Sequence, residues 1–256
     1  MSNGAARGLL AIMESFAIAY ATTFVVLLAV TYVLPAGLFH WLLFTRRSNA
    51  TESMRIQKRR ARPQDVRREI RDSVIALLFF SLYSLFLYNA FLAGKTAIYS
   101  DLSLYPWWWP IFGFVTMTVL HDAYFYAVHR LMHLRPIFRA IHARHHRSLT
   151  PTPWSILSFQ PLETVPQFCF FVLMIFFLPL HPATLFVYLF FDGLVNAAGH
   201  SGHEFSPPEL RKHWLFKYLN AVTHHDLHHS RFHYNFGQYF NFWDRTFGTF
   251  LDRRTS

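Results

Sequence analysis

Five apolar segments constrain the fold of this 256-residue chain more than any other feature. They span residues 17–44, 74–93, a stretch that starts near residue 111, 164–178 and 183–198. A transmembrane helix needs ~20 mostly apolar residues, and the first two segments provide that length. The last two are short for full spans, so partial crossing stays open for the hairpin 164–198. The sequence therefore predicts an all-α, polytopic membrane helical bundle of four to five apolar segments.

Basic residues set the expected orientation of this bundle. Residues 46–72 carry ten Lys/Arg against four Asp/Glu, directly after the first apolar segment. Positive residues beside apolar spans favour the cytoplasmic side, and the arginines between residues 130 and 147 agree with that side. We therefore expect an integral, multi-pass membrane protein with its N-terminus outside and a histidine-rich helical cap on the cytoplasmic face. The net charge of +10 fits anionic lipid headgroups, and we expect no nucleic-acid partner.

Histidines are concentrated in the second half of the chain, where fifteen of the sixteen follow residue 120. One pair has the spacing HxxxH and two triplets have the spacing HxxHH: His129 and His133; His142, His145 and His146; His225, His228 and His229. Side chains three and four residues apart share a helix face, so we expect the rings of each triplet to converge from one helical turn. Imidazole suits iron, zinc, copper and nickel. Eight or more histidines are too many for one ion, so the pattern predicts a two-metal site.

Several other polar residues lie close to these motifs. His200 follows the last apolar segment and is expected to be a further ligand, and His203 could join it. Asp122 and His224 are candidates for orienting a ligand imidazole through its other ring nitrogen. For Asp122, an ordinary buried hydrogen-bonding role is equally open. The remaining histidines are expected to be neighbouring, structural or interfacial residues: His40, His121, His181, His213 and His233.

Longer stretches around these histidines resemble a known family. HDAYFYAVHRLMH, IHARHH, TPTPWSILSFQPLE, NAAGHSGHE and THHDLHHSRFHYNFGQYFNFWDRTFGT occur in this order between residues 121 and 250. Their residues and spacing are similar to those of the fatty acid hydroxylase / sterol desaturase superfamily. The resemblance implies a membrane-bound non-haem di-iron oxygenase whose nine ligands are His129, His133, His142, His145, His146, His200, His225, His228 and His229. It also implies that the segment 234–248 packs over the metal site, with Asp244 and Arg245 in structural roles.

The chain is expected to divide into an anchor and a catalytic domain. Residues 1–120 would form N-terminal membrane helices with the basic cytoplasmic loop 46–72. Residues 121–256 would form a fatty acid hydroxylase-like domain, with a metal-binding cap and the apolar hairpin 164–198. The chain departs from the family at two positions, because sterol C5-desaturase-like members carry histidines where it has Leu157 and Gln160. This departure leaves the ligand motifs intact and concerns sterol desaturation specifically.

The activity implied by the resemblance is that of an oxidoreductase in lipid biosynthesis. Two iron ions, with zinc as a possible substitute, and O2 as co-substrate would hydroxylate or desaturate a fatty acyl chain or a sterol-like lipid from the bilayer. Because Cys169 is the single cysteine, the chain cannot hold an iron–sulfur cluster on its own cysteines. Electrons would therefore come from a separate cytochrome b5-, ferredoxin- or reductase-type protein.

Two other functions are considered beside this one. A zinc-dependent membrane hydrolase would keep few ligands and an open coordination position. A non-enzymatic metal transporter or sensor would place ionisable residues along several spans. The gathering of eight or nine histidines at one face of the bundle disfavours both alternatives.

Overall fold

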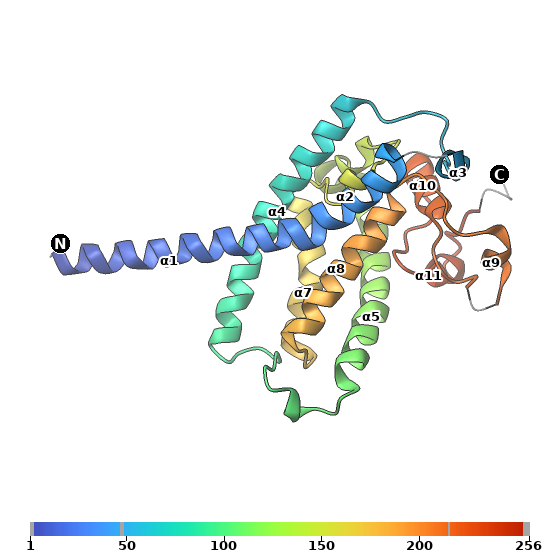
Figure 1. Ribbon diagram of the computed structural model, residues 1–256. Coiled ribbons are helices and arrows are strands. Elements are labelled where there is room, and N and C mark those ends of the chain that lie inside the picture. The colour runs from blue at the N-terminus through green and yellow to red at the C-terminus, as the bar shows by residue number, and fades with distance from the viewer. Residues whose placement is uncertain (1–2, 47–48, 215, 253–256) are drawn as a thin grey trace.

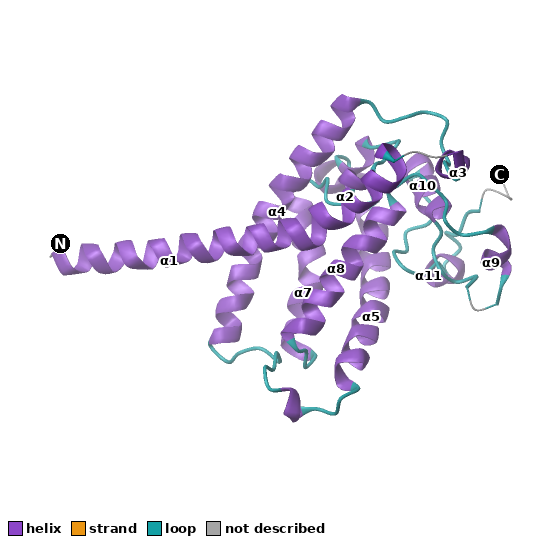
Figure 2. Cartoon of the chain, viewed as in Figure 1, coloured by secondary structure: helices purple, strands orange, loops and turns teal. Residues whose placement is uncertain are grey.

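The computed structural model describes residues 3–46, 49–214 and 216–252, and all regular elements in these ranges are helices (Figure 2). Residues 47 and 48 of the expected basic loop lie outside the described residues. The central helices are α4 (Pro63–Leu92), α5 (Trp109–Met132), α7 (Thr164–Phe177) and α8 (Pro182–Gly199). Their axes have similar orientations, and the short helices of the C-terminal part gather at one end of them (Figure 1). The predicted all-α class is confirmed.

The first apolar segment forms a long interrupted helix. α1 (Asn3–Leu27) continues through the π-helical turn Leu28–Val33 into α2 (Leu34–His40) and a second π-helical turn, Trp41–Thr45. Pro35 lies in the first turn of α2, directly after the π-helical turn, and its missing backbone amide removes one hydrogen bond from this continuous helix. α1 packs on α4 and α2 packs on α8. Figure 1 shows that α1 crosses α4 at a steep angle and that its N-terminal end projects away from the other helices.

Within the described residues, four helical stretches are long and apolar enough to cross a membrane. They are Met13–Thr45, Pro63–Leu92, Trp109–Met132 and Pro182–Gly199, and the apolar helix Pro161–Phe177 is shorter. The prediction of four to five apolar segments is therefore confirmed, with α7 as the short arm of the hairpin. Large apolar side chains such as Phe86 and Phe177 remain exposed on the outside of these helices, as expected of a lipid-facing surface.

One end of the helix bundle is built from short elements, most of which follow α5 in the sequence. His133 ends α5, so one helix carries both an apolar stretch and the first histidine pair. The elements at this end of the bundle are α3 (Asn49–Ser53), α6 (Arg135–Ile137), the turns Phe138–His142 and His145–Arg147, α9 (Pro208–Lys212), α10 (Val222–Arg231) and α11 (Phe242–Thr246). We call this end the cap.

Gly193 allows α8 to pack closely against the first apolar helix. A Cβ atom at this position would lie 2.8 Å from the Thr31 carbonyl oxygen and 2.9 Å from Pro35. Gly193→Ala is therefore expected to lower the free energy of unfolding by ~1–3 kcal/mol, measured by thermal unfolding in detergent. Gly37→Ala is the control, since its Cβ would meet Trp154 at an ordinary 3.9 Å. Equal effects of the two substitutions would contradict this account of the packing.

Candidate metal centre

Nine histidines converge in the cap and form two groups of potential metal ligands. Group 1 contains His129, His133, His142, His146 and His228, and group 2 contains His145, His200, His225 and His229. Within each group, one nitrogen from every ring lies within 4.8 Å of the others. These nine are the same residues that the sequence motifs single out. Their meeting in space is observed, and their binding of metal stays a prediction.

Four parts of the fold supply these rings. The C-terminal end of α5 supplies the HxxxH pair, and the irregular segment 138–147 supplies the first triplet. His200 caps the C-terminus of α8, and α10 supplies the second triplet. Segments that are far apart in the sequence therefore build each group together.

The expectation that each HxxHH triplet converges on one point is wrong. His142 and His146 belong to group 1, whereas His145 belongs to group 2. In α10 the division is reversed, because His225 and His229 belong to group 2 and His228 to group 1. Residues i and i+4 differ by about 40° around an α-helix, whereas i+3 and i+4 differ by about 100°. In α10, the ring at i+3 therefore turns toward the other group, and each triplet contributes to both.

Contacts between ring nitrogens show that the two groups fit bound cations. His129 Nε2 lies 3.1 Å from His142 Nε2, and His225 Nε2 lies 3.0 Å from His200 Nε2. The Nδ1 atoms of His129, His142 and His200 face a carbonyl or carboxylate oxygen and so carry the proton, which leaves a lone pair on each Nε2. Facing lone pairs, as between His129 and His142, repel unless a cation lies between them. Metal–imidazole bonds of ~2.0–2.1 Å at right angles would separate such nitrogens by about 3 Å.

Hydrogen bonds on the far side of these rings fix their orientation. His129 Nδ1 donates to the Phe236 carbonyl at 2.9 Å, and His228 Nδ1 donates to the Tyr234 carbonyl at 2.7 Å. His142 Nδ1 lies 2.6 Å from a carboxylate oxygen of Glu163, which is fully buried. A carboxylate behind a ligand imidazole orients it and increases its basicity. Sequence reasoning missed Glu163, although an acidic residue directly before an apolar helix was a usable signal.

Burial keeps these imidazoles in the neutral form that binds metals. Burial, with a further contribution from neighbouring imidazoles, lowers the pKa well below the usual value in His145, His146, His225, His228 and His229. Burial also lowers the pKa of His200 to about 4. The rings therefore stay unprotonated at neutral pH, as metal ligation requires.

Three of the secondary candidates have other contacts. His203 lies outside both groups, because its Nδ1 bonds to the Ser201 carbonyl at 2.7 Å and its ring packs against Phe44. His224 Nδ1 accepts from the Ala221 amide at the start of α10, so it caps a helix and orients no ligand. Asp122 Oδ1 accepts from the backbone amides of Tyr239 and Phe240 at 2.7 and 3.0 Å. The proposed orienting role of Asp122 is therefore wrong, and the buried hydrogen-bonding alternative is correct.

Comparison with known proteins agrees with this geometry. The fatty acid hydroxylase family matches residues 114–249, which is more than half of the chain. The chain belongs to the fatty acid hydroxylase / sterol desaturase superfamily. It is 28% identical over 222 residues to a Delta(7)-sterol 5(6)-desaturase of Gibberella zeae, covering 86% of this chain and 65% of the relative. It is 32% identical over 189 residues to human lathosterol oxidase, covering 72% of this chain and 61% of the relative.

A hydroxylase is also similar to the chain. Rat cholesterol 25-hydroxylase is 33% identical over 132 residues, covering 51% of this chain and 44% of the relative. The chain spans less than two thirds of the length of these relatives. No solved structure matches it. Together with the four apolar helices, membership of the superfamily identifies an integral membrane protein.

The two positions at which the chain departs from sterol C5-desaturase-like members lie outside both histidine groups. Gln160 donates to the Ala140 carbonyl at 2.8 Å and accepts from the Arg144 amide at 3.3 Å, so it braces the segment that carries the first triplet. Leu157 lines an apolar cavity between the membrane helices. The departure therefore leaves the histidine groups of this superfamily member intact.

The closing motif of the superfamily packs over the histidines, as predicted. Asp244 accepts from the amides of Phe236 and Gly237 at 2.9 and 2.8 Å and from the Thr249 hydroxyl at 2.7 Å. It thereby holds the loop whose carbonyl groups receive His129 and His228. The structural role expected of Asp244 is confirmed.

Asp244→Ala is therefore expected to loosen both the loop and the bound metal. The substitution leaves three buried donors without an acceptor, at a cost of ~1–3 kcal/mol for each unsatisfied group. We expect a lower thermal unfolding temperature in detergent and faster loss of metal to a chelator. Asp101→Ala is the control, because Asp101 is exposed and accepts from a single amide, that of Ser103. Metal loss at the wild-type rate would contradict the role of Asp244.

Proposed function

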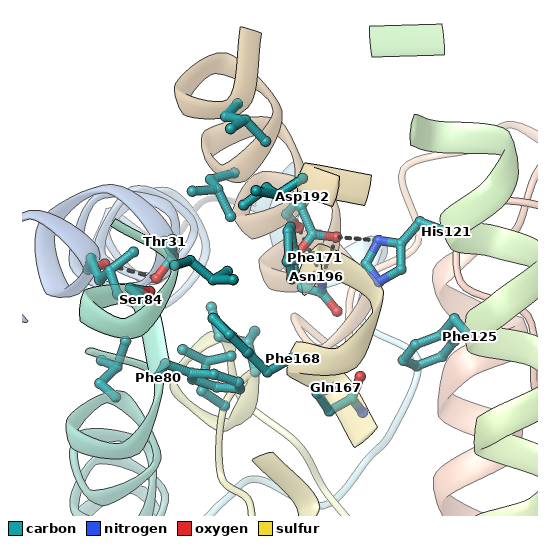
Figure 3. A pocket seen from close by; sticks show the side chains of 18 of the residues that line it. Thr31, Phe80, Ser84, His121, Phe125, Gln167, Phe168, Phe171, Asp192 and Asn196 are labelled. Carbon is teal, nitrogen blue, oxygen red and sulfur yellow. Dashed lines mark hydrogen bonds and ion pairs between the residues drawn. The ribbon is translucent and has the colours of Figure 1, made fainter. Parts of the chain in front are cut away.

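We propose that this chain is a membrane-bound oxidoreductase that uses two iron ions and O2 to hydroxylate or desaturate a lipid. One observation carries the proposal: an apolar cavity between the membrane helices is lined by phenylalanines that contact a histidine of each group. The cavity has a volume of about 360 Å³ and is lined by residues of α1, α4, α5, α7 and α8. Figure 3 shows aromatic side chains, among them Phe80, Phe168 and Phe171, pointing into this space.

Two phenylalanines connect the cavity with the histidine groups. Phe125 lines the cavity and its ring centroid lies 4.9 Å from that of His129 in group 1. Phe159 lines it too, and its ring centroid lies 5.4 Å from that of His145 in group 2. A lipid chain in the cavity would therefore approach both groups. The apolar lining would also keep water away from the reacting carbon.

The chain's residues would hold and orient the reactants. His129, His133, His142, His146 and His228 would bind one iron ion, and His145, His200, His225 and His229 the other. Bound iron would supply O2 activation for the oxidation of an unactivated C–H bond. The cavity walls would select which carbon faces the metals. Relatives named as desaturases, an oxidase and a hydroxylase support a reaction of this class.

Orientation and partners belong to the same proposal. The basic residues of the cap and of the segment 46–72 support a cytoplasmic metal site. The lipid substrate would enter from the bilayer: the relatives support a sterol-like molecule, and the family name supports a fatty acyl chain. Electrons would come from a separate cytochrome b5-, ferredoxin- or reductase-type protein.

Lipid analysis of cells with and without the chain tests this function. Under heavy-isotope oxygen, a hydroxylated product gains one labelled oxygen atom, and a desaturated product loses two hydrogen atoms. The purified protein should contain two iron ions per chain. A single zinc ion with no lipid change would favour a hydrolase, and loosely held metal with no lipid change would favour a transporter or sensor.

A further inference from the structure

A polar cluster interrupts the apolar wall of the membrane cavity. His121 on α5 and Asp192 and Asn196 on α8 line the cavity (Figure 3). Gln238 from the closing motif lines it too. Burying a carboxyl group among membrane helices is costly, so such a group usually has a functional role. The proposed metal chemistry uses none of these four side chains.

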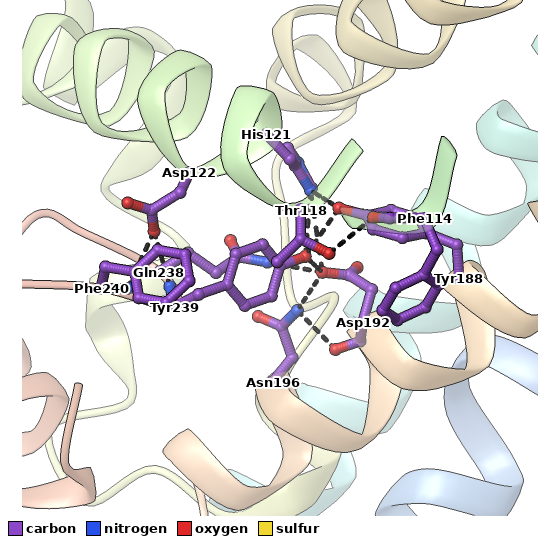
Figure 4. Close-up of polar contacts among 10 residues, drawn as sticks. All are labelled: Phe114, Thr118, His121, Asp122, Tyr188, Asp192, Asn196, Gln238, Tyr239 and Phe240. Atoms are coloured by element: carbon purple, nitrogen blue, oxygen red, sulfur yellow. Dashed lines mark hydrogen bonds and ion pairs between the residues drawn. The ribbon is translucent and has the colours of Figure 1, made fainter. Parts of the chain in front are cut away.

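Three side chains in this cluster donate hydrogen bonds to one carboxylate oxygen atom of Asp192 (Figure 4). Asp192 Oδ1 accepts from the Tyr239 hydroxyl at 2.6 Å, from Gln238 Nε2 at 2.6 Å and from Asn196 Nδ2 at 3.1 Å. Tyr239 is supported in turn by the Tyr188 hydroxyl at 2.9 Å and by His121 Nδ1 at 3.1 Å. Because the single hydroxyl proton of Tyr239 goes to Asp192, its oxygen accepts from these neighbours.

The other carboxylate oxygen of Asp192 faces the cavity. Among the described residues, every hydrogen bond to the Asp192 side chain uses Oδ1. The side chain keeps 21% of its surface exposed, although it lies deep among the membrane helices. Oδ2 is therefore an acceptor without a donor among the described residues. The three hydrogen bonds to Oδ1 hold the carboxylate in place. An occupant of the cavity that donates a hydrogen bond would complete the cluster.

The distance to the histidine groups shows which part of an occupant would meet this acceptor. His121 precedes His129 by eight residues on α5, and Asp192 precedes His200 by eight residues on α8. Eight residues correspond to ~12 Å along a helix, so both helices give the same separation. Phe125 and Asn196 lie halfway along this path and line the cavity. A group bound at Asp192 is thus several carbon–carbon bonds away from a carbon held at the metals.

We propose that Asp192 Oδ2, supported by Tyr239, Gln238 and Asn196, binds the free hydroxyl group of the lipid substrate. A hydroxyl group donates the required hydrogen bond, and the apolar remainder of a lipid alcohol fits the mostly apolar lining of the cavity. The substrate class is then a lipid alcohol that is oxidised at a carbon remote from its hydroxyl. Esters and ethers of the same lipid lack the donor and bind weakly. This inference rests on the proposed function for the reaction and adds the substrate class.

Binding of matched alcohols and ethers tests the inference without turnover. The iron-loaded full chain in detergent is titrated with tritiated cholesterol, hexadecan-1-ol and the methyl ether of each. A hydrogen bond to a charged acceptor corresponds to about a 10- to 100-fold preference for the alcohol. Asp192→Asn replaces the acceptor that faces the cavity by a donor. The ratio of alcohol affinity to ether affinity in this variant should therefore fall to about 1. Ser84→Ala is the control, since Ser84 lines the cavity on α4 and should leave the preference unchanged.

Equal binding of alcohol and ether by the wild-type chain, or no binding of either alcohol, would overturn the inference. So would a wild-type preference in Asp192→Asn, or loss of the preference in Ser84→Ala. The comparison in the wild-type chain needs no variant, so it decides the matter even where Asp192→Asn fails to fold. An alcohol preference with no oxidised lipid in cells would contradict the proposed function but not this inference. Oxidation of a lipid without a free hydroxyl group would contradict this inference but not the proposed function.

Discussion

Alanine at His145 or at His228 is expected to reduce lipid oxidation at least ~100-fold. The two residues belong to different groups, His228 to group 1 and His145 to group 2. If the reaction needs both metals, the loss of either residue stops it to a similar extent. Each substitution removes one ligand from a buried group, so each should also lower the iron content of the purified chain. The measurements are the oxidised lipid in cells and the metal content of the protein.

Two controls separate this effect from general damage to the cap. His213 is exposed and outside both groups, so His213→Ala should keep full activity and iron. His203 is buried and near His200 in sequence, yet it also lies outside both groups. His203→Ala should therefore retain iron, whatever its effect on stability. Full activity in both His145→Ala and His228→Ala would show that the two groups are not the reaction centre.

Replacing Glu163 is expected to weaken metal binding by about 10- to 100-fold. Glu163 lies 2.6 Å from His142 Nδ1 and is fully buried, so it fixes the tautomer that presents Nε2 to the metal. Glu163→Ala removes this partner. Glu163→Gln keeps an oxygen that can accept from the ring, so we expect an intermediate affinity. The measurement is the release of metal to a chelator of known affinity.

A graded response distinguishes a positioning role from a structural one. If Glu163 positions His142, metal affinity should decrease from wild type through Glu163→Gln to Glu163→Ala, with a smaller change in thermal unfolding after metal removal. Glu209→Gln is the matched control, because Glu209 lies on α9 at the surface and pairs with Lys212 at 3.9 Å. Equal metal affinity in wild type and Glu163→Ala would rule out this role.

The sequence alone determined the parts of this protein that depend on local pattern. The length of each apolar run identified the membrane helices, since a span must satisfy its backbone hydrogen bonds within one segment. The spacing of the histidines and the motifs around them identified all nine members of the two groups. Each of these features is read from neighbouring residues, so no knowledge of tertiary contacts was needed.

Only the tertiary structure decided how these residues are shared and supported. The division of each HxxHH triplet between two groups depends on which neighbouring elements face each side of the turn. Glu163 contacts His142, which is 21 residues away in the sequence, and Asp122 contacts the amide of Tyr239, which is 117 residues away. Spacing fixes the angle between side chains on one helix, but it does not fix what packs against that helix. The pairing of the histidines, the support of His142 and the acceptor at Asp192 are therefore properties of the packed helices.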